Sequence, residues 1–127
     1  MKILFLDDDY QRRIWFFDNI HKLGHDITMV NTAVECIEAL STDSYDLISL
    51  DHDLGGTVYA PSDEHSGHHV AKWITEKRPD IRAKILIHSW NPLGANNMVK
   101  TFNEAGIESK WQMFDTVDYW KEVKSDE

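Results

Sequence analysis

The sequence predicts an α/β fold in which a five-stranded parallel sheet is doubly wound, with helices on both faces, as a three-layer sandwich. Short apolar runs of β-type composition alternate along the chain with longer runs whose apolar residues recur every three or four positions. Strands that alternate with helices join through parallel βαβ crossovers. The chain has 127 residues, the size of one domain, and we therefore expect residues 1–127 to form a single domain.

The first three elements follow from the apolar pattern. Residues 2–6 (Lys-Ile-Leu-Phe-Leu) are a β-type run that ends at three aspartates. Residues 10–23 carry apolar side chains at every third position, which is typical of a helix, and Gly24 stands where a C-terminal cap belongs. Residues 27–30 have the composition of a second strand.

The middle of the chain continues the alternation. Thr32 is placed to N-cap a second helix, with Glu35 at the capping-box position. Residues 46–50 (Asp-Leu-Ile-Ser-Leu) form a third β-type run. A polar stretch with Gly, Pro and His follows over about residues 54–66, and a helix then begins at residue 66 or 67 and runs to about residue 77.

The last part of the chain supplies the remaining elements. Residues 84–88 (Lys-Ile-Leu-Ile-His) predict a fourth strand. Residues 93–105 predict a helix that Gly106 ends. Residues 110–114 are expected to form a fifth strand, and residues 116–124 a closing helix.

Composition and charge exclude several classes of protein. Hydrophobic residues make up 42% of the chain, enough to bury a core, so wholesale disorder is excluded. The net charge of −9 disfavours binding to bulk DNA or to an anionic membrane, although a small phosphate held through a metal ion remains compatible. The single cysteine, Cys36, excludes an internal disulfide and a cysteine-based zinc finger. With no membrane-length apolar run and no signal-peptide cleavage site, we expect a cytoplasmic protein.

The polar chemistry of the chain is concentrated directly after three predicted strands. The residues at these strand ends are Asp7, Asp8 and Asp9, then Asp51, His52 and Asp53, and finally His88, Ser89 and Asn91. In doubly wound sheets, ligands bind outside the carboxyl ends of the strands. We therefore expect the functional site at this edge of the sheet.

The acidic residues at these strand ends predict a metal site. Carboxylates a few ångströms apart in a partly dry cleft repel one another, and a divalent cation is the simplest remedy. The candidate ligands are Asp7, Asp8, Asp51 and Asp53. Oxygen ligands favour Mg²⁺ or Mn²⁺, whereas Zn²⁺ or Fe²⁺ becomes a candidate if histidines also bind the metal. The alternative is that Asp8 or Asp9 caps the following helix and the other acids are solvated.

Over about residues 2–120 the sequence resembles the receiver domain of two-component response regulators. The resemblance lies in Asp7-Asp8-Asp9 after the first strand, Asp51 after the third and Ser89 after the fourth. It implies a receiver-like, flavodoxin-like fold in which the first acidic pair and the third-strand aspartate hold Mg²⁺. It also implies that Asp51 accepts a phosphoryl group from a histidine kinase and that Ser89 contacts that group.

Three motifs differ from those of signalling receivers and resemble the cyclic-phosphate processing receiver domains. These motifs are Leu-Asp-His-Asp-Leu-Gly at 50–55, Ser-Gly-His-His-Val at 66–70 and Ile-His-Ser-Trp-Asn-Pro at 87–92. Signalling receivers carry a Lys-Pro pair after the fifth strand, where this chain has Met113-Phe114. The resemblance implies action on a cyclic phosphate, such as a 2′,3′-cyclic end in RNA repair.

We therefore expect a metal-dependent phosphoesterase that processes a cyclic or terminal phosphate of a nucleotide or RNA end. At least one of His65, His68 and His88 is expected to act as a metal ligand or general acid, with His88 or His68 protonating the leaving oxygen and Asp51 at the catalytic centre. Two alternatives stay open. The chain is a phospho-accepting receiver with Asp51 as acceptor, or a non-catalytic pseudo-receiver that binds a protein or nucleotide.

The phosphate of the ligand is expected to contact residues near the acids. Ser89 and Asn91 would orient the phosphate, and Asn91 is also placed to N-cap the helix that follows. Arg12 and Arg13 begin the first helix, and one of them would bind the phosphate bidentately while the other relieves acidic repulsion. We assign the phosphate to Arg13.

Overall fold

The computed structural model describes residues 1–54 and 66–115. In this part of the chain, five strands form one sheet: β1 (Lys2–Leu6), β2 (Asp26–Val30), β3 (Leu47–Leu50), β4 (Lys84–Ile87) and β5 (Lys110–Trp111). Every neighbouring pair is parallel, and the strand order is β2-β1-β3-β4-β5. The predicted doubly wound parallel sheet is confirmed.

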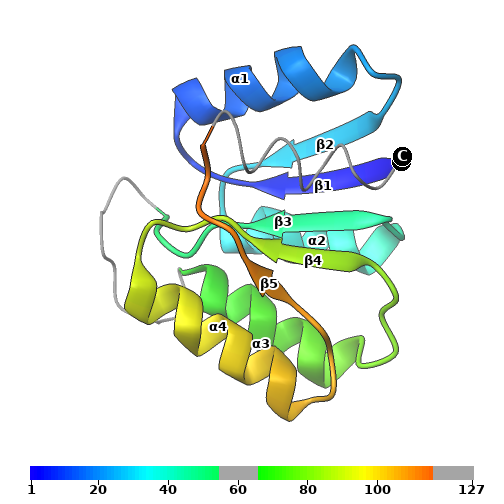
Figure 1. Ribbon diagram of the computed structural model, residues 1–127. Coiled ribbons are helices and arrows are strands. Elements are labelled where there is room, and N and C mark those ends of the chain that lie inside the picture. Colours follow the sequence, from blue (N-terminus) through cyan, green and yellow to red (C-terminus); the bar gives the residue numbers. More distant parts are fainter. Residues whose placement is uncertain (55–65, 116–127) are drawn as a thin grey trace.

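Helices cover both faces of this sheet (Figure 1). The four described helices are α1 (Tyr10–His21), α2 (Ala33–Thr42), α3 (Gly67–Lys77) and α4 (Pro92–Glu104). Phe16 and Ile20 of α1 pack on one face of the sheet, whereas buried residues of α2, α3 and α4 pack on the other. None of the described helices combines the length and apolar composition that crossing a bilayer requires.

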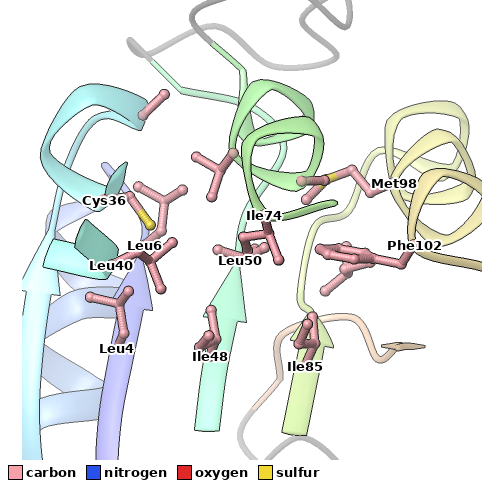
Figure 2. Packing of buried hydrophobic residues seen from close by; sticks show 14 of the residues in the cluster. Leu4, Leu6, Cys36, Leu40, Ile48, Leu50, Ile74, Ile85, Met98 and Phe102 are labelled. Carbon is pink, nitrogen blue, oxygen red and sulfur yellow. The ribbon is translucent and has the colours of Figure 1, made fainter. Parts of the chain in front are cut away.

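The three central strands β1, β3 and β4 are buried and mostly apolar on both sides, because both faces of the sheet are covered. The larger core lies beneath α2, α3 and α4, and Figure 2 shows Leu6, Leu50, Ile74 and Phe102 within it. The smaller core lies beneath α1 and takes the alternate residues of the same strands, such as Phe5. A strand that must bury both faces reads as a continuous apolar run, as residues 2–6 do.

The helix ends agree with the predicted caps. The side chains of Thr32 and Glu35 form the full capping box at the start of α2. α1 ends earlier than predicted, with Lys22 at its C-cap, and Gly24 follows two residues later with a φ of 92°, the left-handed conformation that favours glycine. The side chain of Asp9 accepts a hydrogen bond from the main-chain N–H of Arg12, so Asp9 caps α1.

The C-terminal part differs from the prediction in one respect. Residues 110–114 were expected to form a strand, but β5 contains only Lys110–Trp111. The chain leaves the regular ladder there, while the N–H groups of Gln112 and Phe114 still donate to the carbonyls of Ile87 and His88. The predicted closing helix at 116–124 lies outside the described residues.

Candidate metal and phosphate site

The register of three adjacent strands brings Asp7, Asp51 and His88 into one row. Leu6 of β1 pairs with Leu50 of β3, and Leu50 pairs with Ile87 of β4. The main-chain N–H of Asp51 donates to Leu6 and that of His88 donates to Leu50, so the pairing continues one residue beyond the strands. The next residue of each strand therefore lies at the carboxyl edge beside its neighbours.

Asp7, the member of this row that follows β1, is fully buried. Arg12 binds it bidentately, with Nε 2.8 Å and Nη2 3.0 Å from the two carboxylate oxygens. The Nε2 atom of His88 lies 3.0 Å from Oδ2, and the N–H of Asp9 donates to Oδ1. Burial alone would raise the pKa of Asp7, but His88, Arg12 and the Asp9 N–H together lower that pKa to about 2. Asp7 is therefore an ionised carboxylate.

Asp51 differs because its two oxygens are unequally satisfied. Oδ1 accepts a hydrogen bond from the N–H of His52. Oδ2 is buried and has no hydrogen-bond partner among the described residues; its nearest cation is Nη2 of Arg12, 3.5 Å away. Burial, followed by the negative charges of Asp7 and Asp53, outweighs the effect of His88 and Arg12 and raises the pKa of Asp51 to about 7. A buried oxygen in this condition favours a cation or an electrophile beside it.

His88, directly after β4, is the third residue of the row, and both of its ring nitrogens have partners. Nε2 lies beside Asp7, and Nδ1 lies 2.8 Å from the hydroxyl of Ser49. Its ring stacks on Phe5 with centroids 4.7 Å apart and planes 2° apart. His88 thus faces the acids from a fixed orientation. Ser49 is not among the residues predicted for the site, although a polar residue inside a buried apolar strand is a signal for it.

These side chains fit a divalent cation. Asp7, Asp51 and His88 each offer one ligand atom, and the three atoms lie within 4.8 Å of one another. Two carboxylates with one imidazole suit Mn²⁺, Fe²⁺ or Zn²⁺ as well as Mg²⁺. Two further predicted ligands, Asp8 and Asp53, are not members of this three-residue group.

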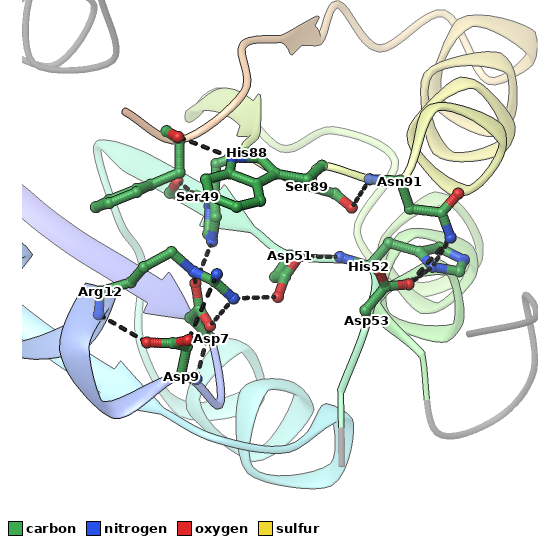
Figure 3. A network of polar contacts seen from close by, with 12 residues as sticks. Asp7, Asp9, Arg12, Ser49, Asp51, His52, Asp53, His88, Ser89 and Asn91 are labelled. Atoms are coloured by element: carbon green, nitrogen blue, oxygen red, sulfur yellow. Dashed lines mark hydrogen bonds and ion pairs between the residues drawn. The ribbon is translucent and has the colours of Figure 1, made fainter. Parts of the chain in front are cut away.

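The two arginines of α1 lie in different surroundings. Arg12 pairs with Asp7, Asp9 and Asp51, and Figure 3 shows its guanidinium among the acids. Its guanidinium carbon also lies 5.7 Å from the ring centroid of Trp90. Arg13, which the sequence analysis assigned to the phosphate, lines a pocket on α1 and β2.

A second polar network lies beside the row and surrounds Asp53 (Figure 3). Nδ1 of His52 and Nδ2 of Asn91 lie 2.9 Å and 3.0 Å from Oδ1 of Asp53. Asn91 also accepts a hydrogen bond from the N–H of Gly94, so it caps α4 as predicted. Asp53 is therefore held by neighbours from two strand ends.

The remaining predicted site residues make contacts outside the row. The hydroxyl of Ser89 accepts a hydrogen bond from the N–H of Asn91 and supports the turn into α4. Nε2 of His68 lies 2.8 Å from the hydroxyl of Thr101, which joins α3 to α4. Burial, Lys72 and His52 lower the pKa of His68. The structure brings neither Ser89 nor His68 into the three-residue group, and His65 lies outside the described residues.

The five parallel strands and the acidic strand ends define a receiver domain of the response-regulator type. Residues 2–104 match the model of the cyclic-phosphate processing receiver domain. The chain belongs to this family, as the sequence motifs led us to expect. A search of curated protein sequences finds no significant match to the chain.

Solved receiver structures share the fold. The response regulator TrrA of Thermotoga maritima in complex with Mg²⁺-BeF is 21% identical over 98% of this chain and 96% of that one, with a TM-score of 0.72. The CheY-like receiver of Methanospirillum hungatei is 18% identical over 98% and 91%, also with a TM-score of 0.72. TrrA in complex with the histidine kinase ThkA gives a TM-score of 0.70 at 21% identity, over 98% of this chain and 96% of that one.

Proposed function

We propose that the chain is a receiver domain that binds a divalent cation and accepts a phosphoryl group on Asp51. The observation that carries this proposal is the Oδ2 atom of Asp51: it is buried, has no hydrogen-bond partner among the described residues and lies beside Asp7 and His88. A carboxylate with one fixed oxygen and one unsatisfied oxygen can offer the second to phosphorus. The expected donor is a phosphohistidine of a kinase, by analogy with TrrA and ThkA.

The residues of the row have separate tasks in this proposal. Asp7, Asp51 and His88 would hold the cation, which when bound supplies positive charge to the phosphoryl oxygens. The N–H of His52 fixes Oδ1 of Asp51 and so orients the carboxylate. An oxygen of Asp51 would form the new bond to phosphorus while the bond from phosphorus to the donor nitrogen breaks. The electron pair of the broken bond stays on that nitrogen.

The test is phosphoryl transfer from acetyl phosphate in the presence of Mg²⁺ or Mn²⁺, followed by intact mass over seconds to minutes. Wild type is expected to gain one phosphoryl mass, and Asp51→Asn is expected to gain none. Asp26→Asn provides a matched control because Asp26 is an exposed residue at the start of β2. No adduct in wild type, together with no binding of Mg²⁺-beryllofluoride, would refute the proposal.

A second candidate function is hydrolysis of a cyclic phosphate on a nucleotide or RNA end. The observation that favours it is the imidazole of His88 inside the acidic row, since a buried histidine beside two aspartates can hold a metal that activates water. A screen of 2′,3′-cyclic nucleotides and cyclic-phosphate RNA ends with each metal separates the two functions. Turnover that is lost in His88→Gln would support hydrolysis, whereas a stoichiometric adduct without turnover supports the receiver.

A further inference from the structure

Arg12 occupies the position between the acids where a cation is needed. Its guanidinium binds both oxygens of Asp7, lies 3.5 Å from Oδ2 of Asp51, and lies 3.5 Å from Asp9 (Figure 3). Within residues 1–54 and 66–115, Arg12 is the basic side chain that forms an ion pair with Asp51. The negative charge of these acids is therefore offset in part by a residue of their own chain.

The same contacts put Arg12 in competition with a metal ion. Oδ2 of Asp7 faces both Arg12 and His88, and Oδ1 accepts from Arg12 and from the N–H of Asp9. A divalent cation shared by Asp7 and Asp51 needs a lone pair of Asp7, and the guanidinium now occupies one on each oxygen of that carboxylate. Both cations cannot hold these oxygens with full hydrogen bonding and coordination at once.

The ring of Trp90 already contacts the guanidinium of Arg12 and would keep it beside the site after it releases Asp7. The indole N–H of Trp90 donates to the carbonyl of Phe114 at 2.8 Å, which fixes the ring next to the site. Trp90 is 57% exposed, and the guanidinium carbon of Arg12 lies 5.7 Å from the centroid of its ring. A guanidinium stacked on an indole keeps its charge and its planar fork of donors, the geometry that matches phosphate.

We infer that Arg12 is a displaceable cation: it neutralises Asp7 and Asp51 without metal, releases Asp7 when a divalent ion binds, and then pairs with the phosphoryl group at Asp51. This inference rests on the proposed function, because it needs a metal and a phosphoryl group at the same site. It also fits the four residues directly after β5, residues 112–115 (Gln-Met-Phe-Asp), which contain no lysine. The phosphate-binding cation comes instead from α1.

Calorimetric titration with Mn²⁺, in the absence of phosphate, tests the competition. Arg12→Ala is expected to bind Mn²⁺ about tenfold more tightly than wild type, because loss of the bidentate pair frees Asp7 and one charge-assisted hydrogen bond is worth about this factor. Arg82→Ala is the control, since Arg82 is exposed and lies at the opposite end of the sheet, before β4. Equal or weaker binding in Arg12→Ala would overturn the competition while leaving the proposed metal site intact.

Titration with beryllofluoride at saturating Mg²⁺ tests whether Arg12 pairs with the phosphoryl group. Arg12→Ala is expected to lose about tenfold or more in beryllofluoride affinity, and Arg12→Lys to fall between it and wild type, because lysine keeps the charge without the fork. Arg12→Lys also serves if the alanine variant folds poorly, as its Mn²⁺ affinity is expected to exceed that of wild type. Unchanged beryllofluoride affinity in both variants would overturn the phosphoryl role. Absence of Mn²⁺ binding in wild type and in both variants would overturn the metal site together with this inference.

Discussion

Gly67, the first residue of α3, lies directly against the main-chain carbonyl of Asp51. A Cβ atom built on Gly67 would stand 1.8 Å from that oxygen and 2.8 Å from its carbon. The N–H of Gly67 also donates to the carbonyl of His52 at 2.9 Å. The start of the helix therefore holds the strand end that carries the proposed phosphoryl acceptor.

Gly67→Ala is expected to reduce the free energy of unfolding by about 3 kcal/mol, the upper part of the range for overpacking, because two main-chain segments would have to separate. The intrinsic preference of alanine for helices, about 1 kcal/mol over glycine, acts in the opposite direction and is too small to compensate. Urea denaturation measures the loss. Glu76→Ala, an exposed change in the same helix, is the control. Wild-type stability in Gly67→Ala would contradict the close contact.

The raised pKa of Asp51 predicts a pH dependence of stability in the metal-free protein. Between about pH 4 and 7 the folded protein retains a proton that the unfolded chain has lost, since the pKa rises from 3.8 to about 7 on folding. The free energy of unfolding should therefore fall as pH rises through this window. Asp7, whose pKa is lowered to about 2, acts in the opposite sense and only below about pH 4.

Urea unfolding in EDTA at several pH values between 4 and 8 checks this expectation. Asp51→Asn is expected to remove the Asp51 contribution to the slope and to be more stable than wild type at pH 8. The exposed Asp26→Asn should retain the wild-type slope. Parallel pH curves for Asp51→Asn and wild type would show that Asp51 titrates normally.

Ser49→Ala is expected to weaken metal binding although Ser49 is not a ligand. Its hydroxyl holds Nδ1 of His88, and loss of such an outer partner typically costs about 10- to 100-fold in metal affinity. The loss should be larger for Mn²⁺ or Zn²⁺ than for Mg²⁺, because imidazole nitrogen suits the first two. Titration with each metal measures the loss of affinity, and the exposed Ser44→Ala is the control. Identical affinities would remove His88 from the ligand set.

Asp7 and Asp8, the first two of the three aspartates after β1, are expected to differ in their effect on metal binding. Asp7→Asn should weaken Mn²⁺ binding by at least about tenfold more than Asp8→Asn, since Asp7 lies in the row with Asp51 and Asp8 does not. Each variant is the matched control for the other, because both remove one charge at neighbouring positions. Equal losses in titrations of the two variants would show that the acidic pair acts as a unit.

The convergence of the strand ends was predictable from the sequence, because parallel strands place their carboxyl ends at one edge whatever their order. It was harder to predict which of two adjacent residues at each strand end points into the site. Asp7, Asp51 and His88 each have a polar neighbour one position later, and side-chain alternation beyond the last paired residue depends on whether the chain stays extended. The observed hydrogen bonds past Leu6 and Leu50 supply that information.

The sequence alone did not show which of the two arginines of α1 points toward the acids. Arg12 and Arg13 differ by one position, which rotates a side chain by about 100° around α1, and the choice depends on where the helix begins. Because Asp9 caps the helix, Arg12 falls toward Asp7 and Asp51. The role of Ser49 required knowledge of which residue lies across the strand pair, which only the register provides.

The single-row arrangement of Asp7, Asp51 and His88 also makes correct strand pairing a condition for any activity. If β3 slipped by one residue against β1, His52 would stand beside Asp7 and Asp51 would leave the row, although Leu50 and its apolar neighbours would still find apolar partners. A chain with such a mispaired sheet would keep its helices and much of its hydrophobic burial but present the wrong side chains at the edge. Metal binding can therefore report misfolded chains that circular dichroism would count as native.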